Sequence, residues 1–327
     1  MKISNLAVTI AALSGVAIAS PALAENDMTI YGKANLSLNQ VDLETGDEDQ
    51  WNLTSNASRI GIKGSVAIND DLKAIYKMEY EVAIDDGDAD GDEFKQRNIY
   101  VGLQGSWGTI IGGKHDTPTK LIGKPVDRFN DLQLGDIKTL LEGENRESNI
   151  VIYSSPTFAE NFTASAAFIP GEDSDNSDNE TNDGLADATS IALSYKSDLL
   201  YAAIANDSEV DGWDLTRLAA DFTLSDVAKA GIIFQDGEES DGDIEQTGFI
   251  VSGEYGIKKI VLKAQYGMST YDFGSFDTDL TQITFGADYK LNKQVKVYSY
   301  YSMIETDVET DTTYDDTVLS AGIEVKF

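Results

Sequence analysis

Apolar and polar residues alternate along most of this chain with the period of two that β-strands show. The C-terminal segment 317–327 is the clearest example. Its apolar face carries Thr317, Leu319, Ala321, Ile323, Val325 and Phe327, and its polar face carries Ser320, Gly322, Glu324 and Lys326. One apolar face, one polar face and a terminal aromatic residue are typical of a strand that lies between lipid and a water-filled interior.

The same alternation recurs along the chain and predicts sixteen strands. We expect them at residues 28–39, 55–68, 72–84, 96–104, 109–115, 148–155, 161–169, 188–196, 199–206, 213–223, 227–235, 246–256, 260–271, 281–290, 294–304 and 317–327. Sixteen is an even number, as in antiparallel membrane barrels. The pattern therefore predicts an all-β fold, a 16-stranded antiparallel transmembrane β-barrel.

The connections between these strands are of two kinds. Short ones at 69–71, 197–198, 225–226 and 292–294 have the composition of hairpin turns. Long ones at 41–53, 85–94, 171–187, 207–214, 236–245, 272–279 and 305–316 hold 37 of the 57 Asp and Glu residues and no Lys or Arg. We therefore expect solvated acidic loops at one end of the barrel and tight turns at the other.

Residues 116–145 differ from the other long connections. This 116–145 segment mixes charges of both signs with large apolar residues, namely Leu121, Ile122, Val126, Phe129, Leu132, Leu134, Ile137, Leu140 and Leu141. About thirty residues is long for a connection in a compact domain, and these side chains would be costly to leave in water. We predict that the segment folds into the barrel interior.

The N-terminus has the features of a secretory signal peptide: Lys2, an apolar run from Leu6 to Ala19, and small residues from Ala22 to Ala24. We therefore assign residues 1–24 to a signal peptide and residues 25–327 to the barrel. Without Lys2 the remainder would carry 23 Lys and Arg against 57 Asp and Glu, a formal charge of −34. Such a charge makes nucleic acid an implausible partner.

Two other classes of structure are excluded. No segment after residue 24 approaches the 18 or so consecutive apolar residues of a membrane-spanning helix. The chain has no cysteine, so its fold is held without disulfides. A closed network of strand hydrogen bonds can supply that stability.

The sequence offers little for catalysis or metal binding. His115 is the one histidine, no nucleophile motif accompanies it, and we expect neither enzyme activity nor a cofactor. Residues 86–91 open like a calcium-binding EF-hand loop. The twelfth position of that loop is Arg97, where a bidentate Glu is required, and strands rather than helices flank it. The motif therefore fails.

Five motifs occur in order at the expected strand positions: YGKANLSL, SRIGIKGS, QRNIYVGLQGSWGTIIGGKHDTP, RESNIVIYSSP and AGIEVKF. Through them the chain resembles the trimeric general diffusion porins of Gram-negative outer membranes, over essentially its whole mature length. The resemblance implies an outer-membrane channel for passive diffusion of small hydrophilic solutes and ions. It also implies that the third external loop, here the 116–145 segment, narrows the barrel, with acidic loop residues facing basic wall residues.

The resemblance places this basic ladder at Lys33 in YGK, Arg59 in SRIGIKG, Arg97 in QRNIYVGL and Arg146 in RESN. The alternation independently puts Lys33 and Arg59 on polar faces. Arg97 is harder to place, because Ile99 and Val101 share its parity. An inward Arg97 would then require the 116–145 segment to cover the inward faces of those two residues.

The acidic partners of the ladder are less defined. LQLGD stands where enteric porins have a Pro-Glu-Phe-Gly-Gly-Asp run. The candidates are Asp131 and Asp136, followed by Asp127, Glu142 and Glu144. The alternative role for each is to cap a short helix or to face solvent. Opposed charges across a narrow gap would create a transverse field.

Several further expectations follow. The acidic loops predict a weak preference for cations, and divalent cations could bridge the acidic rim to lipopolysaccharide. The resemblance implies a homotrimer, and small outward residues such as Gly32 and Gly64 would let neighbouring barrels approach closely. Phe327 resembles the assembly signal that the barrel-assembly machinery reads.

Two alternative functions remain open for a barrel of this kind. A substrate-specific porin would line its lumen with aromatic residues for sugars, or with surplus Lys and Arg for phosphorylated solutes. A barrel-type adhesin or surface receptor would act through its loops. Ion conductance distinguishes the channels from the receptor.

Overall fold

The computed structural model describes residues 26–44, 50–86, 94–171, 184–309 and 312–327. The expected signal peptide, residues 87–93 of the calcium-like motif, and parts of four expected acidic loops lie outside these ranges. The elements are β1 (Asn26–Leu43), β2 (Gln50–Ser55), β3 (Arg59–Ala67), β4 (Lys73–Glu81), β5 (Lys95–Gly105), β6 (Gly108–Asp116), α1 (Pro118–Gly123), η1 (Ile137–Thr139), β7 (Arg146–Ser154), β8 (Phe162–Ile169), β9 (Ala188–Lys196), β10 (Leu200–Val210), β11 (Trp213–Ser225), β12 (Ala228–Glu239), β13 (Glu245–Ile257), β14 (Ile260–Asp272), β15 (Asp277–Lys290), β16 (Val295–Val308) and β17 (Thr312–Lys326).

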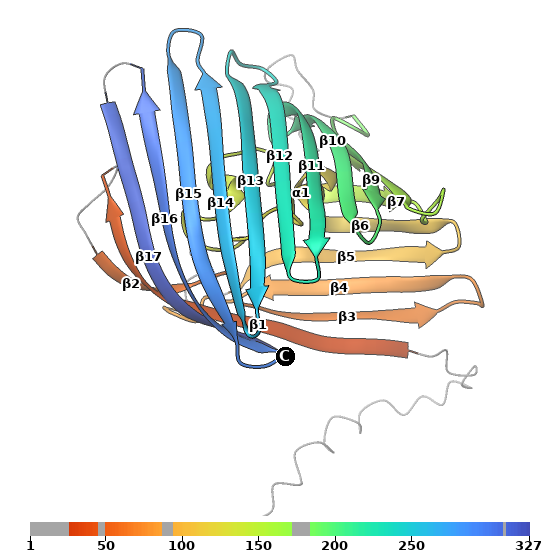
Figure 1. Cartoon of the computed structure of the whole chain (residues 1–327). Helices are drawn as coiled ribbons and strands as arrows, with labels where there is room; N and C mark the ends of the chain where they lie inside the picture. The colour runs from red at the N-terminus through yellow and green to blue at the C-terminus, as the bar shows by residue number, and fades with distance from the viewer. Residues whose placement is uncertain (1–25, 45–49, 87–93, 172–183, 310–311) are drawn as a thin grey trace, which may run out of the picture.

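The strands form one closed antiparallel barrel (Figure 1). Neighbours in sequence pair with each other, and β1 closes the ring by pairing with β17. β2 and β3 both pair with β1, so they are two halves of one barrel strand, interrupted at residues 56–58. Ala57 has a φ of +48° at this break. The described residues therefore form the predicted sixteen barrel strands.

The alternation of the sequence corresponds to the two faces of this barrel. On β17, Leu319 and Ile323 point outward and are 50% and 42% exposed, whereas Ser320 and Glu324 point inward and are 1% and 8% exposed. Each strand thus meets lipid with one set of side chains and the interior with the other. Among the described residues, no helix is both long enough and apolar enough to cross a membrane.

Several strands extend further at the long-loop end than predicted. β10 continues to Val210 and β11 begins at Trp213, so the loop expected at 207–214 is reduced to Asp211 and Gly212. Both turn residues have positive φ, +55° and +78°, as the favoured two-residue hairpin turns require. The Asp-Gly dipeptide was the sequence signal for this turn. Many acidic side chains therefore sit on protruding strands rather than in free loops.

Aromatic rings cover two outward glycines. A Cβ atom built on Gly32 would overlap the ring of Phe327, and one on Gly64 would meet the Tyr76 hydroxyl at 2.5 Å. The glycines leave room for rings from neighbouring strands. The protein's own side chains thus explain why these two positions are small, and their role in close approach of another barrel stays a prediction.

Candidate functional site

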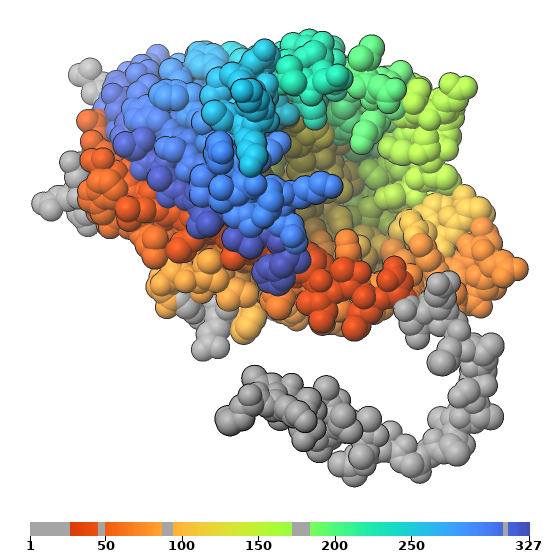
Figure 2. All heavy atoms as spheres, turned by 60° about the horizontal axis from the view of Figure 1, so that its bottom comes forward, coloured from red at the N-terminus to blue at the C-terminus, as the bar shows by residue number. Residues whose placement is uncertain are grey.

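The 116–145 segment enters the barrel directly after β6. Thr117 begins α1, its hydroxyl accepting the backbone N–H of Lys120 at 3.2 Å, with Pro118 in the first turn. Further along, Asp136 caps η1 by accepting the backbone N–H of Lys138 at 3.0 Å. In Figure 1, α1 lies inside the wall of strands. Figure 2, turned to bring the short-turn end forward, shows a hollow with atoms of this part of the chain at its base.

Apolar side chains attach the segment to one side of the inner wall. Ile122, Val126, Ile137, Leu140 and Leu141 form a buried cluster with Ala203, Ala205, Ala219, Ile233 and Ile250 of β10–β13. Where two of the leucines lie, the wall has no side chain: a Cβ on Gly248 would overlap Leu141, and one on Gly267 would overlap Leu140. The apolar residues that could not remain in water are therefore buried inside the barrel.

A row of four glutamines on consecutive strands fixes the backbone of the segment. This glutamine row consists of Gln235, Gln246, Gln265 and Gln282 on β12–β15, each at most 2% exposed. Their side-chain amides donate to the carbonyl oxygens of Glu142, Leu140, Gly135 and Leu134 at 3.1, 2.9, 2.9 and 2.7 Å, respectively. The row provides partners for backbone carbonyl groups of the segment that lie outside the strand ladders.

Arg217 anchors the C-terminal part of the segment. This side chain on β11 is fully buried and contacts Glu144 at 2.5 Å and the Glu142 carbonyl oxygen at 2.6 Å. Its Nε also donates to Gln235 at 2.8 Å. A buried guanidinium needs a carboxylate and further acceptors, and both are present here. Arg217 was not among the residues that the sequence singled out.

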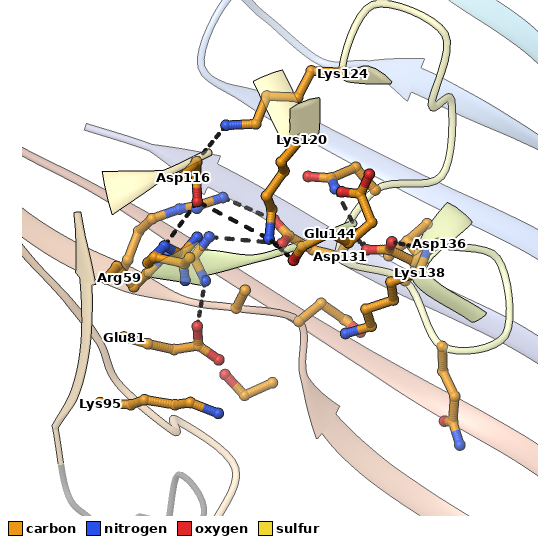
Figure 3. Close-up of a pocket in the computed structure, with 18 of the residues that line it drawn as sticks. Arg59, Glu81, Lys95, Asp116, Lys120, Lys124, Asp131, Asp136, Lys138 and Glu144 are labelled. Carbon is orange, nitrogen blue, oxygen red and sulfur yellow. Dashed lines mark hydrogen bonds and ion pairs between the residues drawn. The ribbon is translucent and has the colours of Figure 1, made fainter. Parts of the chain in front are cut away.

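Between the segment and the opposite wall lies a cavity of about 820 Å³ (Figure 3). Eight of its lining residues are basic, namely Arg59, Lys77, Lys95, Arg97, Lys120, Lys124, Lys138 and Arg146. Six are acidic, namely Glu79, Glu81, Asp116, Asp131, Asp136 and Glu144. The cavity is therefore rich in both charges with a small excess of positive charge, although the chain as a whole is strongly acidic.

Asp131 stands at the centre of one ion-pair group in this cavity. Its carboxylate lies 2.7 Å from Lys33 Nζ, 2.8 Å from an Arg59 nitrogen and 3.9 Å from an Arg97 nitrogen. Burial acts to raise the pKa of Asp131, but Lys33 and Arg59 outweigh it and lower this pKa to about 2. Three of the four predicted basic residues thus converge on one loop carboxylate.

Arg97 reaches the lumen by a β-bulge, not by loop coverage. Met78 pairs with Ile99 but Tyr80 pairs with Gln96, so β5 holds an extra residue at this point. Arg97 and Asn98 consequently both point inward, each 8% exposed, while Val101 faces outward and is 65% exposed. The expectation that the segment covers Ile99 and Val101 is wrong. Arg97 also pairs with Glu81 and, at 3.3 Å, with Glu79.

Arg146 belongs to a second ion-pair group, centred on Asp116. The Asp116 carboxylate lies 2.8 Å from Arg146 Nε, 2.6 Å from Lys124 Nζ and 4.0 Å from Lys120 Nζ. Figure 3 shows Lys120 of α1 and Lys124, which directly follows α1, directed at Asp116. One carboxylate therefore faces three cations, which leaves this part of the cavity locally positive. The partner expected for Arg146 was an acid further along the segment.

The other predicted acids do not face the basic ladder directly. Asp136 lines the cavity, but its carboxylate accepts the backbone N–H groups of Lys138 and Asp131. Asp127 is buried within the segment and accepts the Phe129 N–H at 3.1 Å. Glu142 accepts the Tyr271 hydroxyl at 3.1 Å, and Glu144 pairs with Arg217. For Asp136 the capping role weighed in the sequence analysis is the observed one.

Several charged lining residues were not predicted as site residues. Lys77, Glu79 and Glu81 had a signal in the sequence, since they occupy the polar face of the strand at 72–84. No sequence signal beyond a place in the 116–145 segment pointed to Lys120, Lys124 and Asp116. Their roles depend on how α1 is oriented, which the strand periodicity does not reveal.

Comparisons with known proteins agree with this architecture. A family model described as Gram-negative porin matches residues 7–309. The chain is 24% identical to outer membrane porin protein 32 of Delftia acidovorans, over 99% of this chain and 95% of that protein. In structure it is similar to an anion-selective porin from Comamonas acidovorans, with a TM-score of 0.73, 20% identity, and coverage of 93% of this chain and 100% of the other. The trimer form of OmpT from Vibrio cholerae matches with a TM-score of 0.67 and 17% identity over 92% of this chain and 99% of that one. The barrel, its lumenal segment and the family match together identify the chain as an outer-membrane β-barrel that belongs to the Gram-negative porin family.

Proposed function

We propose that the protein is a water-filled channel for passive diffusion of small hydrophilic solutes and ions. The observation that carries this proposal is the cavity of about 820 Å³, whose lining includes fourteen charged residues inside a closed barrel. A cavity lined in this way is suited to hydrated ions and polar solutes rather than to a bound apolar ligand. We further propose that Lys33, Arg59, Arg97 and Arg146 on the wall, with Asp131 on the 116–145 segment, form the constriction.

Two charged regions along the channel, the acidic long-loop end and the lining of the cavity, determine the ion preference. Acidic residues at the long-loop end attract cations to the mouth, whereas the cavity lining has eight basic residues against six acidic ones. Because the narrowest section limits the flux, we propose a weak preference for anions at low salt. The weak cation preference expected from the composition is not supported by this lining. The structurally similar porin from Comamonas acidovorans is described as anion-selective, which supports the proposed preference for anions.

Single-channel recording in a planar bilayer tests both proposals. We expect stepwise conductance and, across a salt gradient at low ionic strength, a reversal potential of anion-selective sign that shrinks as screening increases. A barrel that inserts without conducting would instead favour the adhesin or receptor function. A cation-selective sign would mean that the acidic mouth dominates.

The role of the basic ladder has its own test. Replacing Arg59 and Arg97 together by Ser should enlarge the conductance and shift the reversal potential toward cations, because bulk and positive charge both leave the constriction. Replacing Lys229 and Lys290 by Ser removes the same charge from residues that do not line the cavity, and serves as the control. Equal behaviour of the two double variants would exclude the arginines from the constriction.

We also propose the remaining assignments on narrower grounds. A homotrimer is supported by the trimer form of OmpT among the structural relatives. Recognition of Phe327 by the barrel-assembly machinery, divalent bridging to lipopolysaccharide, and removal of residues 1–24 as a signal peptide rest on the sequence features described above. The absence of enzyme activity also stays a proposal from the sequence; in the structure the ring nitrogen of His115 contacts the backbone oxygen of Asp116 at 2.7 Å.

A further inference from the structure

A second cavity of about 410 Å³ lies inside the barrel and has a different character. No Asp, Glu, Lys or Arg is among its lining residues, which come from β4–β10 and α1. Helix α1 separates the two cavities. Lys120 and Lys124 line the charged one, whereas Pro118, Leu121 and Ile122 line the second. The volume is within the range of roughly 300–1,000 Å³ that small-ligand pockets have.

The side of this uncharged pocket next to α1 is apolar and aromatic. Tyr100 of β5, Tyr201 of β10 and Leu121 of α1 all line it and remain partly exposed. The Tyr201 side chain reaches toward α1, with its hydroxyl 3.5 Å from the backbone oxygen of Ile122. Behind them, Ile111 and Ile152 belong to a buried cluster on the inner wall. Apolar surface left open to a water-filled lumen is unfavourable, and a planar ring could cover it by stacking on the tyrosines.

The outer end of the pocket carries hydroxyl and amide groups, from Gln104, Thr109, Ser154, Thr163, Ser165 and Ser194. These residues lie near the short turns: Thr109 follows the turn at 106–107, and Ser194 precedes the turn at 197–199. Ser154 and Thr163 are exposed and make no side-chain hydrogen bond to the described part of the chain. Their hydroxyls can donate to and accept from a solute that enters through the short-turn end.

We propose that the uncharged pocket is a binding station for small aromatic solutes that carry hydroxyl groups, entered from the short-turn end of the barrel. The ring lies between Tyr100, Leu121 and Tyr201, and the hydroxyl groups meet the polar rim. The inference rests on the proposed channel function. It adds that the lumen sorts solutes into two paths, with ions passing the charged cavity and neutral aromatic solutes pausing beneath α1.

The test uses single channels inserted in known orientation, with 4-hydroxybenzyl alcohol as the probe and erythritol as the aliphatic control. The probe on the short-turn side should produce concentration-dependent interruptions of the ion current. Erythritol at equal concentration should not. The probe should act at lower concentration from the short-turn side than from the long-loop side, because α1 and the 116–145 segment lie between the pocket and the long-loop end.

Two variants locate the effect. Leu121→Ser should shorten the interruptions by roughly five- to tenfold, the change expected for losing one half-buried aliphatic side chain. Ser194→Phe should abolish them by filling the pocket. Leu193→Ser is the matched control, because Leu193 neighbours Ser194 on the same strand but faces outward and is 41% exposed. Unchanged interruptions in Ser194→Phe, or equal effects of probe and erythritol, would overturn the proposal while leaving the channel function intact. A barrel without ion conductance would overturn the channel function itself.

Discussion

The ammonium nitrogen of Lys33 lies 2.7 Å from a carboxylate oxygen of Asp131, a residue 98 positions later in the chain. This contact joins the first strand of the barrel to the 116–145 segment across the lumen. Asp131 has a φ of +67°, and its N–H is held at 2.8 Å by the capping carboxylate of Asp136. Asp136 thus positions the residue that meets the basic wall, although it does not face that wall itself.

Replacing Asp131 by Asn should increase the preference for anions. The substitution leaves Lys33, Arg59 and Arg97 without this counter-charge. The interaction between two unit charges about 4 Å apart is about 1 kcal/mol even in bulk water, which corresponds to roughly a fivefold change in the local concentration of an ion. Reversal potentials at low salt measure the change. Glu142→Gln is the control, because Glu142 lies in the same segment but does not line the cavity. An identical reversal potential in the two variants would contradict the central place given to Asp131.

Replacing Gln246 by Leu should loosen the 116–145 segment. The carbonyl oxygen of Leu140 and the N–H of Glu142 both lose their buried partner, and each unsatisfied group costs about 1–3 kcal/mol. We expect lower thermal stability and noisier open-channel currents. Gln294→Leu, at an exposed turn residue, controls for the change of side chain. Quiet currents and an unchanged melting temperature would show that the glutamine row does not hold the segment.

Acidification should leave the Asp131 contact intact until pH values near 2. The pKa of this carboxyl is depressed to about 2, so the stability that its ionised form contributes is fully present above its ordinary pKa. That stability is lost only as the pH falls through the depressed value. Ion selectivity measured from pH 7 to pH 3 should therefore show no step attributable to Asp131. A step near pH 4, absent from Asp131→Asn, would contradict this assignment.

Asp127 should respond to pH in the opposite sense. Burial, followed by repulsion from Asp136 and Glu144, raises the pKa of Asp127 well above its ordinary value. Its charged form therefore destabilises the fold at neutral pH, and protonation relieves this as the pH falls. Asp127→Asn should melt at a higher temperature than the wild type at pH 7, with the difference shrinking on acidification. A constant difference across the pH range would exclude titration of Asp127 as its cause.

Deleting Phe327 should separate assembly in cells from stability in vitro. Phe327 is 60% exposed as a residue, and its ring packs over Gly32. The Phe327 backbone closes the barrel through hydrogen bonds to Gly32 of 2.9 and 3.1 Å. Even full burial of one aromatic side chain is worth only about 2–3 kcal/mol. We expect much less folded protein in the outer membrane, with refolding in detergent nearly unchanged. Equal losses in both assays would assign Phe327 to packing, and no loss in cells would reject the assembly signal.

The periodic pattern was sufficient for the strands because each one faces two different solvents. It could not place Arg97, since a single extra residue in β5 exchanges the two faces and leaves no mark on composition. The apolar content of the 116–145 segment indicated burial, but not which wall would receive it. Gly248 and Gly267 on that wall leave space for Leu141 and Leu140, respectively. This role of the two glycines is visible only once the position of the leucines is known.

The ion-pair partners were the least predictable part of the site. Lys33 and Arg59 were placed by alternation and motif, yet their shared partner Asp131 was one of five candidates. Arg146 and Glu144 were candidates, but their partners Asp116 and Arg217 were missed, because both pairings depend on the path of a connection that has no repeating pattern. Side chains on regular strands have their direction fixed by parity, whereas those on α1 are oriented by tertiary contacts.

The wall of β10–β13 is hydrophobic on both faces. Ile232 and Phe234 point toward lipid, whereas Ile233 and Ile250 point inward and belong to the cluster that attaches the 116–145 segment. Excising the segment is therefore not a simple way to engineer a wider pore. The alanines and isoleucines of β10–β13 that the segment covers would then face water. This part of the wall would tend to collapse inward or to bind hydrophobic solutes. A variant with a wider pore therefore also needs polar residues in place of these apolar residues on the inner face of β10–β13.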